Sequence, residues 1–181
     1  MDCGSCGCTN ACHLFPASDH VASEHFVRII YRIIIPEIML QCRKDDIVMS
    51  KLFDLTGRTA IVTGGASGLG NGMAKALSDA GCRVALLDYS PDVEQAAQAI
   101  EKETGNLAFG VQGDLIDRTD LKRAYHQCVE LLGGKLTILI NNAGGSYTAP
   151  IEEYRLEKWD WLLELNLTAM FEMSCLAIAD M

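Results

Sequence analysis

The chain has 181 residues, of which 49% are hydrophobic and 22% are charged, and these values suit one globular domain with a core of its own. Its formal net charge of −9 argues against a nucleic-acid-binding surface, which requires a basic patch. The longest apolar stretch, FVRIIYRIIIPEIML, is too short to cross a membrane and contains two arginines, a proline and a glutamate, so we expect neither nucleic acid nor a membrane as a partner.

Residues 1–48 precede the first predicted element and change from a cysteine-rich start to an apolar stretch and then to a charged one. No helical or strand period persists across them, so we expect an extension that is disordered or not native. The stretch MSKLFDLTGR is typical of a natural N-terminus, and we expect Met49 to be the biological start. The cysteine-rich start offers zinc-ligand side chains in a spacing that fits no closed zinc site, so we expect no metal. These side chains are Cys3, Cys6, Cys8, Cys12 and His13.

From residue 57 onward, segments typical of strands alternate with segments typical of helices. Apolar and β-branched runs predict four strands, at 60–63, 82–88, 107–114 and 135–144. Apolar residues at helical spacing predict helices between them, at 71–81, 90–105 and 118–134. We expect the 159–181 segment to form a further long, apolar and buried helix.

Helix-capping residues refine these boundaries. Ser90 is expected to cap the second helix, with Pro91 in its first position and Gly105 at its end. Thr119 or Asp120 is expected to cap the third helix.

Alternating strands and helices predict an α/β fold with a parallel sheet that is covered on both faces. Right-handed crossovers then give a doubly wound Rossmann sheet of strand order 3-2-1-4, with ligands at the carboxyl ends of the strands. We expect residues 49–181 to form a partial NAD(P)-binding Rossmann domain, truncated after the fourth strand and the helix that follows it. The fourth strand would then form an edge of the sheet.

The glycine-rich stretch TGGASGLG, residues 63–70, lies between the first strand and the first helix. Gly64 would allow a tight turn, Gly68 a close approach of the backbone to a pyrophosphate, and Gly70 close packing of the helix on the sheet. Ser67 and Leu69 would add hydroxyl or backbone donors. The pyrophosphate would bind at the positive N-terminus of the helix.

Asp88 ends the second strand, where a carboxylate can accept hydrogen bonds from the ribose hydroxyls of a dinucleotide. The same carboxylate would repel a 2′-phosphate, and residues 63–74 contain no arginine or lysine to neutralise that phosphate. We therefore expect NAD as the cofactor rather than NADP. The alternative is that Asp88 only caps the end of the strand.

Three motifs in this order resemble the short-chain dehydrogenase/reductase family: the glycine-rich stretch, GDL at 113–115 and NNAG at 141–144. The resemblance covers roughly residues 52–181. It implies that Asp114 and Leu115 line the adenine. It also implies that the chain at Asn142, Ala143 and Gly144 passes close to the adenosine and nicotinamide ribose side and braces the central sheet. Asparagine also tolerates turns, so Asn141 and Asn142 have an architectural role as well.

The resemblance also implies the chemistry. A serine and a Tyr-x-x-x-Lys motif would move the proton while hydride passes between the nicotinamide and a secondary alcohol or ketone. Those residues are expected after a fifth strand that this sequence lacks, so we expect the chain to be inactive alone. The alternative is a non-catalytic dinucleotide-binding module.

Two polar features of the last segment have a bearing on catalysis. Asn166 is similar to a family asparagine that anchors a proton-relay water, although it could instead be a core asparagine satisfied by the backbone. Tyr154 and Lys158 have the catalytic spacing but precede Asn166, and we expect them not to be the catalytic pair.

The resemblance further suggests a substrate class and an assembly. The sequence is most similar to the gluconate 5-dehydrogenase and 2-deoxy-gluconate 3-dehydrogenase group, which favours a sugar acid, with a 3-oxoacyl thioester as the alternative. Full-length members of the family form homotetramers. Lone cysteines in apolar segments, namely Cys82, Cys128 and Cys175, are typical of a reducing compartment, and no secretory signal is present, so we expect a cytoplasmic protein.

Overall fold

The computed structural model describes residues 52–181, and Phe53–Met181 form one folded unit. The first elements are β1 (Thr59–Thr63), α3 (Gly68–Asp79), β2 (Arg83–Asp88), α4 (Val93–Thr104) and β3 (Ala108–Gln112). They are followed by α5 (Arg118–Leu131), β4 (Ile138–Ile140), η2 (Ile151–Glu153), α6 (Leu156–Leu163), η3 (Glu164–Thr168) and α7 (Ala169–Asp180). The predictions for residues 1–48, their cysteines and the start at Met49 lie outside the described residues.

The four strands form one parallel sheet in the order β3-β2-β1-β4, as predicted. Ile61 in β1 pairs with Ala85 in β2 and with Leu139 in β4. All five residues of β1 are buried, which is typical of a central strand covered on both faces. Within the described residues, β4 forms one edge of the sheet and β3 the other.

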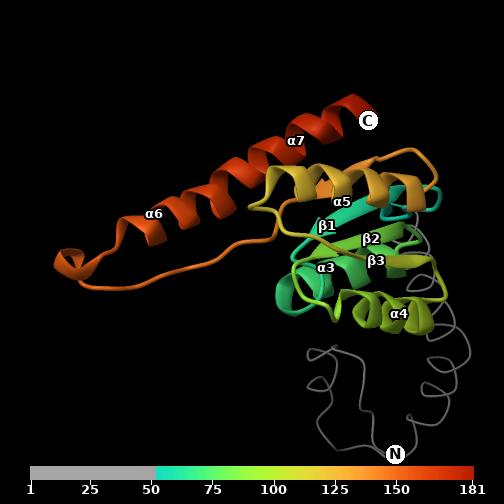
Figure 1. Cartoon of the computed structure of the whole chain (residues 1–181). Coiled ribbons are helices and arrows are strands. Elements are labelled where there is room, and N and C mark those ends of the chain that lie inside the picture. The colour runs from blue at the N-terminus through green and yellow to red at the C-terminus, as the bar shows by residue number, and fades with distance from the viewer. Residues whose placement is uncertain (1–51) are drawn as a thin grey trace, which may run out of the picture. The chain divides into compact units, whose positions relative to one another are not determined.

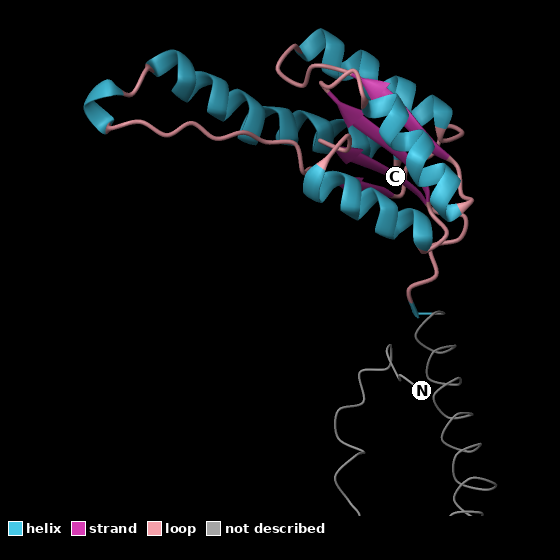
Figure 2. Ribbon diagram, turned by 90° about the horizontal axis from the view of Figure 1, so that it is seen from below, coloured by secondary structure: helices cyan, strands magenta, loops and turns pink. Residues whose placement is uncertain are grey.

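Helices cover both faces of the sheet (Figures 1 and 2). Successive strand residues point to opposite faces, so β1 sends Ile61 to one side and Val62 to the other. Ile61 packs with Tyr125 of α5 and Met173 of α7 in one core cluster. Val62 packs in a second cluster, with apolar residues of α3 and α4 such as Ala74 and Ala97.

Two predicted helix caps were wrong. Helix α5 is capped by Asp117, whose Oδ1 accepts the N–H groups of Thr119 at 2.8 Å and Asp120 at 3.3 Å. An aspartate in this position can reach both free N–H groups of the first turn, which Thr119 and Asp120 cannot do from inside the helix.

Helix α4 begins at Val93 rather than at Pro91. Ser90 caps a preceding turn instead, because its Oγ accepts the N–H of Asp92 at 3.2 Å and its carbonyl accepts that of Val93 at 3.3 Å. The predicted end of α4 is confirmed, since Gly105 adopts a left-handed conformation with φ of 75°.

The predicted burial of the last helix was also wrong. Helix α6 has no buried residue, and it extends away from the sheet together with η2 (Figure 1). Helix α7 buries one stripe at four-residue spacing, Ala169, Met173 and Ala177. Leu167 of η3 and Phe171 of α7 remain 56% and 66% exposed in the described part of the chain. By length and a mean hydropathy of 1.4, the continuous Leu156–Asp180 helix could span a membrane, a property that core helices of soluble proteins share.

Candidate functional site

A cleft of about 550 Å³ opens at the carboxyl ends of the strands. This edge is where a doubly wound sheet places its ligand, and the volume lies within the usual range for small-molecule sites. Most of the predicted cofactor residues line the cleft: Gly64, Ser67, Asp88, Asp114, Leu115, Asn142, Ala143 and Gly144. Gly68, Leu69, Gly70 and Asn166 do not line it.

Sequence reasoning missed several lining residues. Tyr89 and Ile116 directly follow predicted site residues, so their place next to Asp88 and Leu115 could have indicated them. Trp161 and Leu165 come from the last helix, and no motif marked them.

The glycine-rich turn has the backbone shape that its sequence predicted. Gly64 and Gly68 both adopt left-handed conformations, with φ of 65° and 57°. A Cβ on Gly70 would collide with the carbonyl oxygen of Gly64 and lie 2.5 Å from Asn142 Nδ2. The turn can therefore pack against β4 only because Gly70 has no side chain.

The N-terminus of α3 provides an anion-binding surface beside the cleft. The backbone N–H groups of Gly68, Leu69 and Gly70 are in the first turn and have no acceptor in the described part of the chain. The helix dipole adds partial positive charge at this end. Leu69 is 82% exposed and could contribute only through its backbone, whereas the Ser67 hydroxyl makes no capping bond and is available to a ligand.

Asp88 both lines the cleft and holds the glycine-rich turn. Its Oδ2 accepts the N–H of Ala66 at 2.9 Å, and its Oδ1 accepts the N–H of Ser90 at 2.9 Å. Each carboxylate oxygen has a further lone pair, so Asp88 can still accept a hydrogen bond from a ligand hydroxyl. The capping role and the ligand-binding role of this residue are therefore compatible.

Asn142 ties the ends of β1 and β4 together. Its Nδ2 donates to the carbonyl oxygens of Thr63 at 3.0 Å and Gly64 at 3.2 Å. Thr63 Oγ1 in turn accepts the backbone N–H groups of Asn142 and Ala143, both at 3.0 Å. The architectural role expected for this asparagine is thus present in the structure.

Asn166 lies in the π-helical segment η3 and pairs with both backbone polar groups of Gly145. Its Oδ1 accepts the N–H of Gly145 and its Nδ2 donates to the carbonyl of Gly145, both at 2.9 Å. A Cβ on Gly145 would collide with the ring of Trp161. This pairing holds the chain after β4 against the last helix, and π-helical segments of this kind are frequent at functional sites.

The loop from Gly113 to Ile116 forms the wall of the cleft beyond β3. Asp114 Oδ1 accepts the N–H of Ile116 at 2.9 Å, and the N–H of Asp114 donates to Asp120 Oδ2 at 2.7 Å. The Arg123 side chain, hydrogen-bonded to Asp120, holds the pKa of that carboxyl below its usual value, and the N–H of Asp114 lowers this pKa further.

Tyr154 and Lys158 have the spacing of a catalytic pair but not the helical arrangement that this spacing suggested. Tyr154 precedes α6 and has extended backbone angles, so the two residues do not share a helix face. Lys158 Nζ lies 5.8 Å from the ring centroid of Tyr147 and 5.6 Å from that of Trp161. The lysine thus contacts aromatic faces, which stabilise it by cation–π attraction.

Buried thiols offer no alternative nucleophile. Burial raises the pKa of Cys82 to about 11 and that of Cys128 to about 12, so both remain protonated and weakly reactive at neutral pH. No group of three or more metal-ligating side chains gathers within residues 52–181.

The cleft has the shape and donors to hold a dinucleotide. Gly64 and Gly70 leave no room for a side chain at the turn, the N–H groups at the start of α3 are free, and the Asp88 carboxylate lines the cleft. The family model described as short chain dehydrogenase matches residues 58–181.

Curated relatives and a solved structure agree with this match. A D-beta-hydroxybutyrate dehydrogenase of Cupriavidus necator is 34% identical over 128 residues, which cover 70% of this chain and 49% of the relative. The rhamnolipids biosynthesis 3-oxoacyl-(acyl-carrier-protein) reductase of Pseudomonas aeruginosa is 36% identical over 132 residues, covering 71% and 48%. A mutant short-chain dehydrogenase/reductase of Serratia marcescens superimposes with a TM-score of 0.67 and 32% identity, covering 71% and 52%. The chain spans about half the length of the curated relatives it matches.

Proposed function

The chain belongs to the short-chain dehydrogenase family, and we propose that it forms the dinucleotide-binding part of an oxidoreductase acting on a secondary alcohol or ketone. The observation that carries the proposal is the glycine-rich turn, of which Gly64 and Ser67 line the cleft at the carboxyl ends of the strands and which leads into the free N–H groups at the start of α3. When bound, a nicotinamide cofactor would supply the hydride chemistry, and the residues of this chain would bind and orient it.

We propose NAD rather than NADP as the cofactor. Asp88 lines the cleft with a carboxylate that would accept from ribose hydroxyls and repel a 2′-phosphate. The pyrophosphate would bind the N–H groups at the start of α3, Asp114 and Leu115 would contact the adenine, and the nicotinamide ribose would lie near Gly144. Titration of the purified 181-residue chain with NADH and NADPH tests this, with tighter binding of NADH expected. Equal affinity, or no binding of either, would contradict it.

Asn166 is proposed to support proton transfer in the whole enzyme. Its carboxamide fixes the backbone N–H and C=O of Gly145, and the π-helical segment that contains it departs from the regular helical hydrogen-bond pattern. A backbone carbonyl in such a segment can accept a hydrogen bond from water, which would then relay a proton. This proposal makes Asn166 a residue that orders solvent rather than an acid or base.

The 181-residue chain is proposed to bind the dinucleotide without turnover. Among residues 52–181, Tyr154 and Lys158 are the one pair with the catalytic spacing, and their geometry does not support proton transfer. Incubation with NAD and a panel of alcohols, followed at the absorbance of NADH, should show no reaction. Measurable oxidation would contradict the proposal.

A sugar acid is the substrate class that we propose for the whole enzyme, on the resemblance of its sequence to gluconate dehydrogenases. The relative from Pseudomonas aeruginosa supports the alternative, a 3-oxoacyl thioester. Assays of the whole enzyme with a gluconate-type acid and with a 3-oxoacyl thioester would separate the two, since only one should be turned over efficiently.

Assembly and location are proposed on the same basis. The exposed apolar residues of the last helix, which include Leu167 of η3 and Phe171 of α7, support a homotetramer of the whole enzyme. The free thiols of Cys82, Cys128 and Cys175 support a reducing, cytoplasmic location. Sedimentation velocity of the whole enzyme tests the first proposal, and fractionation of cells tests the second.

A further inference from the structure

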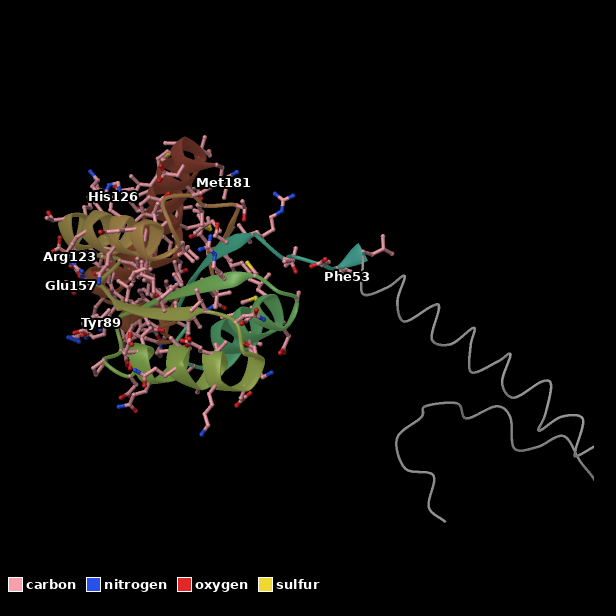
Figure 3. All side chains as sticks on the ribbon, turned by 90° about the vertical axis from the view of Figure 1, so that its right-hand side faces the viewer. Phe53, Tyr89, Arg123, His126, Glu157 and Met181 are labelled. Atoms are coloured by element: carbon pink, nitrogen blue, oxygen red, sulfur yellow. The ribbon has the colours of Figure 1, made fainter. Side chains whose placement is uncertain are left out.

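A second cavity, of about 220 Å³, adjoins the main cleft on the outer side of the loop from Gly113 to Ile116. Both are lined by Tyr89, Gly113 and Asp114. Arg123 and Asp120 of α5 line the second cavity but not the main cleft. Figure 3 shows Arg123 and Tyr89 on the same side of the domain. The loop that carries Asp114 therefore separates the proposed adenine site from a cluster of charged side chains.

Arg123 holds this cluster together through all parts of its side chain. Its Nε donates to Asp120 Oδ1 at 2.6 Å, and its Nη2 donates to the carbonyl of Gln112, the last residue of β3, at 2.7 Å. Its Nη1 donates to Gln127 Oε1 at 2.8 Å. Such a planar fork fixes its partners in direction as well as in distance.

Asp120 carries this constraint to Asp114. As the third residue of α5, Asp120 is in the position from which an acidic side chain usually reaches back to the N-cap residue. Its Oδ2 instead accepts the N–H of Asp114 at 2.7 Å. A Cβ on Gly113 would lie 2.6 Å from that of Ala124, so the loop lies directly on α5. The Asp114 backbone is thus fixed from the α5 side by a charge-assisted hydrogen bond.

We propose that Asp120 and Arg123 are positioning residues that hold Asp114 at the purine end of the cleft and thereby set a preference for adenine. The inference rests on the proposed dinucleotide-binding function. Asp114 Oδ1 accepts from Ile116, whereas Oδ2 has no partner in the described part of the chain and can accept from the 6-amino group of adenine. A purine with a keto oxygen at this position would place two acceptors against each other. The preference requires that Asp114 be held in place. The Asp120–Arg123 pair fixes its backbone N–H, and the N–H of Ile116 orients its carboxylate.

Calorimetric titration of the 181-residue chain with ADP and IDP tests the inference, because these ligands differ only in the 6-substituent of the purine, amino or keto, and in the proton that the keto form carries on N1. We expect the unmodified chain to bind ADP about tenfold more tightly than IDP, the equivalent of one hydrogen bond to a charged group. Arg123→Gln and Asp120→Ala should each reduce this ratio to about twofold or less. Arg123→Lys keeps the charge but loses the fork, so it should retain an intermediate ratio.

Lys122→Gln is the matched control, since Lys122 is the exposed neighbour on α5 and its replacement changes the net charge equally. This variant should keep the tenfold ratio. An unchanged ratio in Arg123→Gln would overturn the inference and leave the proposed function intact. Equal weakening of ADP and IDP would also overturn it, because that result indicates general loosening of the cleft. If the unmodified chain binds neither ligand, the proposed function fails and the inference fails with it.

Discussion

Gly70 and Gly72 lie two residues apart in α3 and have very different surroundings. A Cβ at Gly70 would collide with the turn, whereas one at Gly72 would meet nothing within 4 Å. We expect Gly70→Ala to lower the free energy of unfolding by about 1–3 kcal/mol and to abolish ADP binding, since the turn must shift. Gly72→Ala should instead raise this free energy by about 0.5–1 kcal/mol, because alanine suits a helix better. Urea unfolding followed by circular dichroism compares the two, and equal stability would contradict the packing described.

Asp88 decides the cofactor preference in our proposal. Asp88→Asn removes the charge that would repel a 2′-phosphate but keeps one acceptor oxygen, enough for one of the two backbone bonds to Ala66 and Ser90. We expect the preference for NADH over NADPH to fall about tenfold, as for the loss of one unfavourable charge contact. Fluorescence titration with both nucleotides measures it. Asp92→Asn, at an exposed acid nearby, should leave the preference unchanged, and the same result for Asp88→Asn would contradict the assignment.

At the scale of elements, the first turn of α5 tests which residue caps it. Asp117 accepts the N–H groups of Thr119 and Asp120. We expect Asp117→Ala to lower the free energy of unfolding by about 0.5–2 kcal/mol, the usual effect of losing an N-cap. Thr119→Ala should change it by less than about 0.5 kcal/mol, because Thr119 is exposed and its side chain makes no capping bond. A larger effect at Thr119 than at Asp117 would support the cap expected from sequence.

The strands and the first three helices could be predicted because their signals are local. Buried apolar runs mark β1 and β2, and Gly105 marks the end of α4 through its left-handed conformation. The burial of the last segment could not be predicted in this way. Its 23 apolar-rich residues (159–181) indicated one buried helix. Burial depends on which other elements cover each face of that helix, and the sequence of the segment does not specify those elements. The partner of Asn166 is likewise Gly145, which lies 21 residues earlier in the chain, so the last segment alone does not indicate it.

At the scale of the whole molecule, the buried thiols and the buried phenol of the two core clusters should make the stability of the fold sensitive to high pH. Burial raises the pKa of Cys82 and Cys128 from 9.0 to about 11 and about 12. Burial and the hydrogen bond to Asp180 also raise the pKa of Tyr125. The folded state favours the neutral form of each group, so their contribution to stability is complete below pH 9 and is lost as the pH rises toward these folded-state values.

We therefore expect the urea midpoint to be constant from pH 7 to 8.5 and to fall steadily from pH 9 to 10.5. Over that range the free energy of unfolding should fall by roughly 1–2 kcal/mol for each buried thiol. The measurement requires a reductant. Cys128→Ala should show a shallower fall than the unmodified chain, although its stability at pH 7 is lower because of the cavity. Cys175→Ala, at an exposed cysteine, should keep the original slope. A midpoint that does not change with pH would contradict the burial of these thiols.

The sequence by itself determined the alternation of strands and helices, the strand order, and the glycine-rich turn, because periodicity and motifs depend on residues close together in the chain. Only the tertiary structure placed Trp161 and Leu165 at the cleft and gave Asn166 its partner in Gly145. It also brought Asp120, which binds Arg123, into contact with the backbone of Asp114. These contacts form where separate elements meet. Which side chains meet there is set by how helices pack on the sheet, and the local pattern of either element alone does not specify it.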